Sequence, residues 1–172
     1  WDFEQKDYHR WVKAEGINQK FPPFCPEKEE TNGCYVGNGF HDSSAALIPY
    51  LTSFQEPFVL ISTGTWCISL NPFNTEPLTS EELAQDCLCY LTADGKPVKA
   101  ARYFGGHEHE QAVLKIAGEY GLNVNFFQKK ENPAALNEYA TFMQSLVNKQ
   151  VASTRLAFGN TPVHRIFVDG GF

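Results

Sequence analysis

The chain has 172 residues, of which 42% are hydrophobic and 14% aromatic, enough to form one ordinary core or two partial ones. Acidic residues outnumber basic ones by 20 to 14 and the basic residues are not clustered, which argues against nucleic acid as the main partner. No apolar run approaches the ~20 residues that a bilayer-spanning helix requires, so we expect no membrane partner either.

Five cysteines are present, at Cys25, Cys34, Cys67, Cys87 and Cys89. Their number is odd, none are paired as CxxC, and the last two are spaced so that a strand would turn both toward one face. This pattern is more typical of buried, reduced thiols than of a disulfide framework, and its spacing does not fit a zinc site. We therefore predict a cytoplasmic protein.

The first third of the chain predicts few regular elements. The opening "WDFEQKDYHRWVKAEGI" has a short helical pattern that Gly16 stops, and the Pro-rich "FPPFCPEKEETNG" reads as a connector. A strand and turn are expected over residues 34–40, followed by a helix over residues 42–52. In that helix Leu47 and Tyr50 can face inward.

The middle of the chain predicts two hairpins. "PFVLIS" is a β-branched apolar run typical of a buried strand, "TGT" turns it, and "WCISL" runs back as its partner. "NPFNTEPLT" reads as a loop. "DCLCYLT" and "PVKAARYF" then flank the turn sequence "ADGK" as a second hairpin.

Two helices and a strand are expected to close the chain. The first helix covers about residues 106–120 and ends at Gly121; the second begins at Pro133 and ends near residue 149. "RIFV" is the last buried strand, and the order of elements predicts a mixed α/β fold. Because a Gly-Gly corner after a strand normally leads into another element, we expect the chain to be an internal piece of a longer protein.

Three strand ends carry small polar residues and glycines: "VGNGFHD", "LISTGTW" and "FVDGGF". A glycine-rich turn after a buried strand lets backbone N–H groups approach an anion closely, and a threonine hydroxyl adds a further donor. Three such turns in one chain, one of them with an acidic residue, indicate a cleft that handles phosphate.

Better-known phosphate and hydrolase motifs do not fit. GxxxxGK[ST] is absent, and the dinucleotide motif that begins at Gly37 and Gly39 has Asp42 where its third glycine belongs. An aspartate there would repel a pyrophosphate at the helix start. GxSxG is also absent, since Ser62 lies in "ISTGT".

The ordered set "GFHDSSAALIPYL", "FVLISTGTWCISLNPF" and "RIFVDGGF" closely resembles the FGGY carbohydrate kinases. The resemblance covers essentially the whole chain and implies an α/β fold of the actin-like, ribonuclease H-like ATPase superfold. It implies that residues 1–55 form the end of an N-terminal sugar-binding lobe and residues 56–172 the first part of a C-terminal nucleotide-binding lobe. The "HD" and "STGTW" forms look most like the branch that phosphorylates L-rhamnulose or L-fuculose.

The resemblance also implies roles for individual residues. Asp42 matches the catalytic aspartate, a general base that accepts the proton of the attacking sugar hydroxyl, and His41 would bind and orient the sugar. Gly64 and Thr65 match the turn that cradles the transferring phosphate. The nucleotide side would be formed by Asp169, Gly170 and Gly171. ATP and Mg²⁺ are the cofactors that such a phosphoryl transfer implies.

Each of these residues also has a simpler interpretation. Asp42 could be an ordinary helix N-cap, His41 a turn residue bonded to its own backbone, and the glycine corners tight structural turns. "HEHE" at residues 107–110 has the wrong spacing for a zinc helix, and we interpret it as a polar first turn in which Glu108 and Glu110 complement the helix dipole.

The resemblance leaves parts of the kinase unaccounted for. The family's first phosphate loop and most of its sugar pocket precede the matching residues, and its adenosine-binding glycines follow them. We therefore expect the chain alone to be inactive. Two alternatives stay open: an actin-like relative that binds ATP and acts through domain closure, and a purely structural domain. The sequence leaves the choice between monomer and homodimer open.

Overall fold

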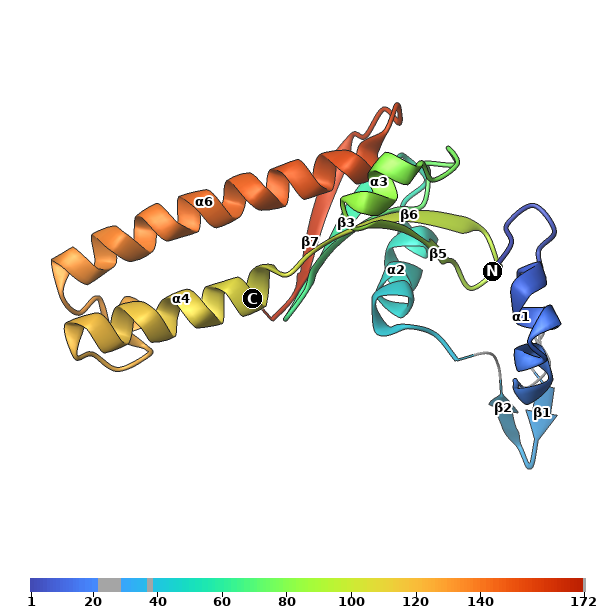
Figure 1. Ribbon diagram of the computed structural model, residues 1–172, viewed down its shortest axis with the longest axis horizontal. Helices are drawn as coiled ribbons and strands as arrows, with labels where there is room; N and C mark the ends of the chain where they lie inside the picture. The colour runs from blue at the N-terminus through green and yellow to red at the C-terminus, as the bar shows by residue number, and fades with distance from the viewer. Residues whose placement is uncertain (22–28, 37–38, 172) are drawn as a thin grey trace.

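A five-stranded mixed sheet forms the centre of the computed structural model, which describes residues 1–21, 29–36 and 39–171 (Figure 1). The strand order is β5-β6-β4-β3-β7. Helix α2 lies on one face of this sheet, and helix α6 crosses the other (Figure 1). The strands are β3 (Phe58–Thr63), β4 (Cys67–Asn71), β5 (Cys87–Leu91), β6 (Pro97–Tyr103) and β7 (Arg165–Gly170).

Both predicted hairpins are confirmed. β3 and β4 are antiparallel with Leu60 opposite Leu70, and β5 and β6 are antiparallel with Cys87 opposite Ala101. In the second turn Gly95 has a φ of 77°, a conformation that favours glycine, as the "ADGK" pattern predicts.

The predicted final strand is present, but the expectation that it is buried is wrong: β7 is an edge strand in which Ile166 is 53% and Val168 67% exposed. β7 is parallel to β3 from Phe58 opposite Arg165 to Thr63 opposite Gly170. A parallel pair needs a long crossover, and α4, α5 and α6 supply it. The carboxyl ends of β3 and β7 therefore lie side by side.

Helix α2 (Asp42–Ser53) covers the main core, as predicted. Leu47 of this helix is 1% exposed and packs against the apolar side chains on the facing side of the sheet. The buried members of this core are Leu47, Phe58, Leu60, Ile68, Leu70, Val98 and Ala100. Successive side chains of a strand point to opposite faces of the sheet. The core side chains of β3 and β4 therefore face α2, and the residues next to them in sequence face α6.

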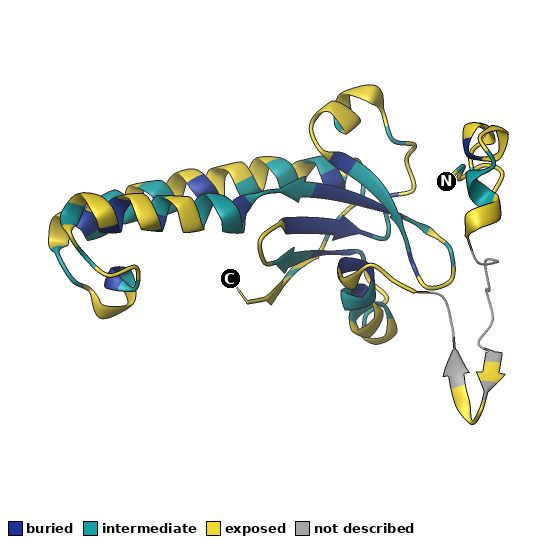
Figure 2. Ribbon diagram, turned by 60° about the horizontal axis from the view of Figure 1, so that its bottom comes forward, coloured by how far each residue is buried: buried dark blue, intermediate teal, exposed yellow. Residues whose placement is uncertain are grey.

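The long helical arm is formed by α4 (Gly105–Tyr120), α5 (Phe126–Lys129) and α6 (Pro133–Phe158). Gly121 ends α4 in the left-handed conformation with a φ of 63°, and Pro133 opens α6, both as predicted. The two long helices lie side by side and bury a second apolar cluster away from the sheet (Figure 2).

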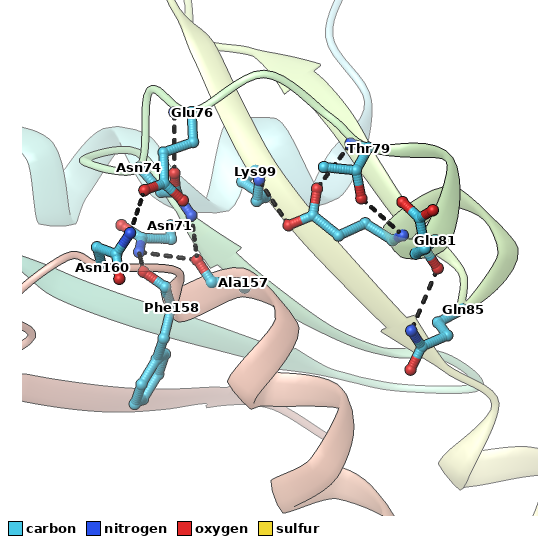
Figure 3. Close-up of polar contacts among 11 residues, drawn as sticks. Asn71, Asn74, Glu76, Thr79, Glu81, Gln85, Lys99, Ala157, Phe158 and Asn160 are labelled. Carbon is cyan, nitrogen blue, oxygen red and sulfur yellow. Dashed lines mark hydrogen bonds and ion pairs between the residues drawn. The ribbon is translucent and has the colours of Figure 1, made fainter.

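The predicted end of α6 near residue 149 is wrong, because the helix continues to Phe158. Its last turns are held by the sheet. The Ser69 and Thr154 hydroxyls are 2.8 Å apart. Asn71 Nδ2 donates to the Ala157 carbonyl at 2.9 Å, as Figure 3 shows. These partners are more than 80 positions distant in sequence, so the local pattern of residues 150–158 does not reveal them.

A short helix that the sequence analysis did not predict, α3 (Ser80–Ala84), precedes β5. Its capping box is complete, since Thr79 Oγ1 accepts from the Glu82 N–H at 3.1 Å and Glu82 Oε2 accepts from the Thr79 N–H at 2.8 Å. Glu82 also pairs at 2.7 Å with Lys99, whose side chain is 3% exposed (Figure 3). This ion pair fixes α3 to β6.

The N-terminal segment has little regular structure. It contains α1 (Arg10–Ala14), the 3₁₀ turn η1 (Ile17–Lys20), and a two-stranded hairpin of β1 (Glu29–Thr31) and β2 (Cys34–Val36). β2 is the strand of the strand and turn expected over residues 34–40, and Gly37, in the expected turn, lies outside the described residues. None of the helices within the described ranges combines the length and apolarity needed to cross a bilayer.

The thiol prediction is confirmed in part. Cys67 and Cys87 are buried, and all four cysteines in the described ranges are free thiols. Cys34 is exposed, which corrects the expectation of burial: its strand pairs within an outlying hairpin instead of joining the main sheet. Cys25 lies outside the described residues.

Candidate functional site

Two of the three polar strand ends meet at one corner of the sheet. The parallel pairing sets Thr63 opposite Gly170, and Thr63 Oγ1 donates to the Asp169 carbonyl at 3.0 Å. The turn after β3 therefore lies next to the end of β7. We call this set the glycine corner: Gly64, Thr65, Asp169, Gly170 and Gly171.

The close contact between the two strand ends requires Gly170. Its φ is 116°, and a Cβ at this position would lie 2.0 Å from the Thr63 carbonyl oxygen. Any other residue would have to separate the strands and adopt a strained backbone. Gly170 therefore has a structural role at the end of β7, whatever else it does.

Gly64 and Gly171 differ from Gly170 in this respect. At Gly64 the nearest described atom to an added Cβ would be the Trp66 carbonyl oxygen at 3.8 Å, and at Gly171 no described atom would lie within 4 Å. Neither residue has a positive φ that would require glycine. The fold as described does not need glycine at these two positions, and the backbone there is open to close approach by a ligand.

The amino end of α4 packs against the same turn. The His107 N–H donates to the Thr65 carbonyl at 3.2 Å, and Glu108 lies in the first turn of the helix, as predicted. Glu110 lies in the second turn, which corrects the expectation that it belongs to the first. The positive end of the helix dipole is therefore directed at the turn that holds Gly64 and Thr65.

His41 and Asp42 stand at the start of α2. His41, and not Asp42, is the N-cap: its Nδ1 accepts from the Ser43 N–H at 3.3 Å. Asp42 is the first residue of the helix, and its Oδ1 accepts from the same N–H at 2.7 Å. The interpretation of Asp42 as a simple cap is therefore wrong. Its side chain is 91% exposed, and His41 Nδ1 lies 2.8 Å from its carboxylate.

The surroundings of His41 are aromatic. Its ring lies 5.4 Å from that of Tyr90 on β5, and burial raises the pKa of Tyr90, with the charge of Asp42 adding to the effect. A pocket of about 370 Å³, within the range of small-molecule sites, opens beside it. Trp1, Phe40 and Tyr90 are among the side chains that line this pocket.

The two parts of the predicted site occupy different regions of the sheet. His41 and Asp42 lie beside β5 and the glycine corner includes the end of β7, and these two strands are the opposite edges of the sheet, about 19 Å apart at the usual strand spacing. The structure thus brings together the predicted phosphate and nucleotide residues, and places the predicted sugar-side residues elsewhere.

Helix α2 connects the two parts. Tyr50, two turns after Asp42, has its ring 4.9 Å from that of Phe167 on β7. Burial raises the pKa of Tyr50, and the charge of Asp169 together with a hydrogen bond to its carboxylate raises it further. The residue pattern of α2 indicates only a core position for Tyr50, because its proximity to Asp169 depends on the return of β7.

A metal site formed by protein side chains alone is not indicated. Within the described ranges, no group of three or more His, Cys, Asp or Glu side chains is arranged to hold a metal ion. Mg²⁺ in phosphoryl-transfer sites is bound through one or two carboxylates together with the substrate phosphates, so a single carboxylate such as that of Asp169 fits that arrangement.

Comparisons with known proteins agree with this geometry. Residues 55–154 match the family described as carbohydrate kinase FGGY, C-terminal domain. The crystal structure of a carbohydrate kinase from Novosphingobium aromaticivorans superposes with a TM-score of 0.52 and 28% sequence identity, over 66% of this chain. The chain spans 28% of the length of that kinase. A search of curated proteins gives no match.

The family match supports the predicted fold class. It includes β3 to β6, α4 and most of α6, and thus the turn of the glycine corner that follows β3. Together with the mixed sheet it confirms the predicted α/β fold class of the actin-like, ribonuclease H-like ATPases. Since more than half of its length matches, the chain belongs to the FGGY carbohydrate kinase family.

Proposed function

We propose that this chain forms part of an ATP-dependent sugar kinase in which Asp42 is the general base. The observation that carries the proposal is the Asp42 carboxylate, which is 91% exposed at the first position of α2 in a chain of the carbohydrate kinase family. Its hydrogen bonds go to the adjacent Ser43, so the carboxylate remains accessible to a substrate. The helix dipole favours a negative charge at that position.

The proposed reaction transfers the γ-phosphoryl group of ATP to a sugar hydroxyl. The hydroxyl oxygen forms a bond to phosphorus as the bond from phosphorus to the β–γ bridging oxygen breaks, and the hydroxyl proton passes to Asp42. His41, next to that carboxylate, would donate to or accept from a sugar hydroxyl. The proposed substrate is a ketose such as L-rhamnulose or L-fuculose, an assignment supported by the sequence resemblance.

The glycine corner would hold the phosphates. Open backbone at Gly64 and Gly171 permits close approach, Thr65 adds a hydroxyl, and Asp169 and Gly170 form the neighbouring strand end. Mg²⁺ bound to the phosphates of ATP would neutralise charge that develops during transfer. Because the sugar-side and phosphate-side residues lie near opposite edges of the sheet, the proposal requires the two substrates to be brought together across it.

The remaining assignments are part of the same proposal. Residues 1–55 would form the end of a sugar-binding lobe and residues 56–172 the first part of a nucleotide-binding lobe, with α2 packed against the sheet of the latter. Sugar and ATP would be the partners, in a cytoplasmic protein.

The test is ADP release by the natural gene product that contains these residues, with Mg·ATP and a panel of L-rhamnulose, L-fuculose, xylulose, ribulose and glycerol. A sugar-dependent rate on one ketose supports the proposal and identifies the substrate. No sugar-dependent rate on any of the five, combined with a nucleotide-dependent rise in melting temperature, would favour an ATP-binding relative without kinase activity. Absence of both would favour a structural domain.

A further inference from the structure

We propose that Gly106, at the second position of α4, positions the Gly64–Thr65 turn for phosphate binding. The inference rests on the proposed function and adds to it a residue that none of the predicted motifs contains. Gly106 is a positioning residue, since it acts on the backbone of the turn and would not itself touch the substrate.

The contact between Gly106 and the turn is a contact between backbones. A Cβ at Gly106 would lie 2.0 Å from the Gly64 carbonyl oxygen, 2.9 Å from the Gly64 carbonyl carbon and 3.0 Å from the Thr65 Cα. None of these atoms belongs to a side chain that could rotate away. Even one methyl group at this position would therefore push the turn and the helix apart by roughly 1 Å or more.

A backbone hydrogen bond and a buried thiol also lie where the turn meets the start of α4. The His107 N–H donates to the Thr65 carbonyl at 3.2 Å. Burial raises the pKa of the Cys67 thiol, and hydrogen bonds from the backbone N–H groups of Gly64 and Gly106 partly offset that rise. Cys67 is 2% exposed, and its sulfur lies beside the start of α4, 3.0 Å from the position that a Cβ on Gly105 would take.

The helix itself does not call for glycine here. Gly106 has no positive φ, and alanine is the better helix former at an ordinary position. Gly118, on the same helix, provides the contrast, because an added Cβ there would have no described atom within 4 Å. Of these two glycines, only Gly106 is explained by close packing, and its partner is the turn predicted to cradle the phosphate.

The experiment compares Gly106→Ala with Gly118→Ala in the natural gene product that contains this chain. The readouts are the Kd for Mg·ATP, KM for ATP, KM for the sugar, melting temperature, and hydrogen exchange at the amides of Thr65 and His107. Gly106→Ala is expected to lower kcat/KM for ATP by about 100-fold, the scale of a ~1 Å misplacement. KM for the sugar should stay within about 2-fold of the wild type, and the amide of His107 should exchange faster. Gly118→Ala should match the wild type in every binding and kinetic readout.

A second pair of variants covers the case in which Gly106→Ala does not fold. Cys67→Ala removes the buried sulfur beside the start of α4 and should weaken Mg·ATP binding by about 10-fold. Cys67→Ser keeps an acceptor and should restore most of that binding. If Cys67→Ala and Cys67→Ser lower the melting temperature by similar amounts but only Cys67→Ala weakens Mg·ATP binding, the role of Cys67 is not merely structural.

The outcomes separate this inference from the proposed function. A folded Gly106→Ala protein that binds Mg·ATP as tightly as the wild type overturns the inference and leaves the kinase proposal standing. Equal losses of ATP and sugar affinity also overturn it, because they indicate general damage. A wild-type protein that binds no nucleotide overturns the proposed function, and the positioning role with it.

Discussion

The glycine corner and the start of α2 are held in place in opposite ways. In the glycine corner, backbone packs directly on backbone, and at Gly170 a single added carbon would lie 2.0 Å from a neighbouring carbonyl oxygen. At the start of α2, the Asp42 carboxylate is 91% exposed and is bonded to the next residue in the chain. A closely packed strand end, predicted to serve the phosphate, is thus combined with an exposed carboxylate that is predicted to serve the sugar.

This contrast separates folding from chemistry. Changes where the ends of β3 and β7 pack together, at Thr63 and Gly170, should affect stability and nucleotide binding together, because under the proposed function the same contacts serve both. Changes at Asp42 should affect turnover alone, because few of its contacts would be lost.

The largest expected effect is on turnover in Asp42→Asn. Removal of a general base lowers kcat by about 100-fold or more, while an exposed substitution shifts the free energy of unfolding by no more than about 0.5 kcal/mol. ADP release and thermal unfolding measure the two quantities. Glu81→Gln, an exposed carboxylate on α3, is the control and should leave both unchanged. A large drop in stability in Asp42→Asn would show that the start of α2 is structural and would end the contrast.

The largest expected effect on stability is that of Gly170→Ala. A non-glycine residue at a φ of 116°, with a Cβ directed at the Thr63 carbonyl, should destabilise the fold by about 2 kcal/mol or more. Denaturant unfolding measures this loss. Gly171→Ala is the control, since an added Cβ there meets no described atom within 4 Å, and should be nearly neutral for folding. Equal stabilities for the two variants would contradict the close packing.

Thr63→Val should have a smaller effect on the same corner. It removes the hydrogen bond from Oγ1 to the Asp169 carbonyl while keeping a β-branched shape, at a cost of about 1 kcal/mol of stability. Because this bond joins the two strand ends, the Kd for Mg·ATP should rise in the same variant. Thr141→Val on α6 also removes a hydroxyl bonded to a carbonyl, at 2.9 Å, and should leave nucleotide affinity unchanged.

The smallest expected effect concerns Glu108 in the first turn of α4 and depends on pH. Burial raises the pKa of Glu108, but hydrogen bonds from Lys149 and Tyr103 and the charge of Lys149 lower it below its ordinary value of 4.5. The folded state therefore favours the ionised form, and the stabilisation is present above pH 4.5 and is lost as pH falls through the folded-state pKa.

Glu108→Gln should accordingly cost about 0.5 kcal/mol at pH 7, a modest value for a pair that is partly exposed. The difference in melting temperature between wild type and variant should shrink as pH falls below 4.5. A difference that is constant from pH 7 to pH 3 would show that the ion pair with Lys149 does not stabilise the helix next to the glycine corner.

The elements that the sequence predicts well are those fixed by local chemistry. The turn at Gly95, the stop at Gly121 and the start at Pro133 depend on backbone conformations that only a few residue types favour. The two hairpins follow from short connections between apolar runs. Long-range contacts decide the rest: Thr154 extends α6 by pairing with Ser69 on β4.

The same division applies to the candidate site. The residues of the glycine corner could be predicted because glycine after a buried strand is visible in the sequence. Their neighbours could not, because Gly106 and Tyr50 reach the corner only when α4 and β7 pack onto the sheet. Separation of Asp42 from the corner was also hidden, since strand order is a property of the assembled sheet.

The parallel pairing of β3 with β7 has a consequence for how the molecule acquires its function. Thr63 and Asp169 are hydrogen-bonded although 106 positions separate them, so their contact closes a very large loop. Such distant pairing is slow relative to the formation of the local hairpins and helices. A growing chain can complete both hairpins and the helical arm before the glycine corner exists. Under the proposed function, phosphate binding would then become possible only when the last strand returns, and nucleotide binding would report that folding is complete.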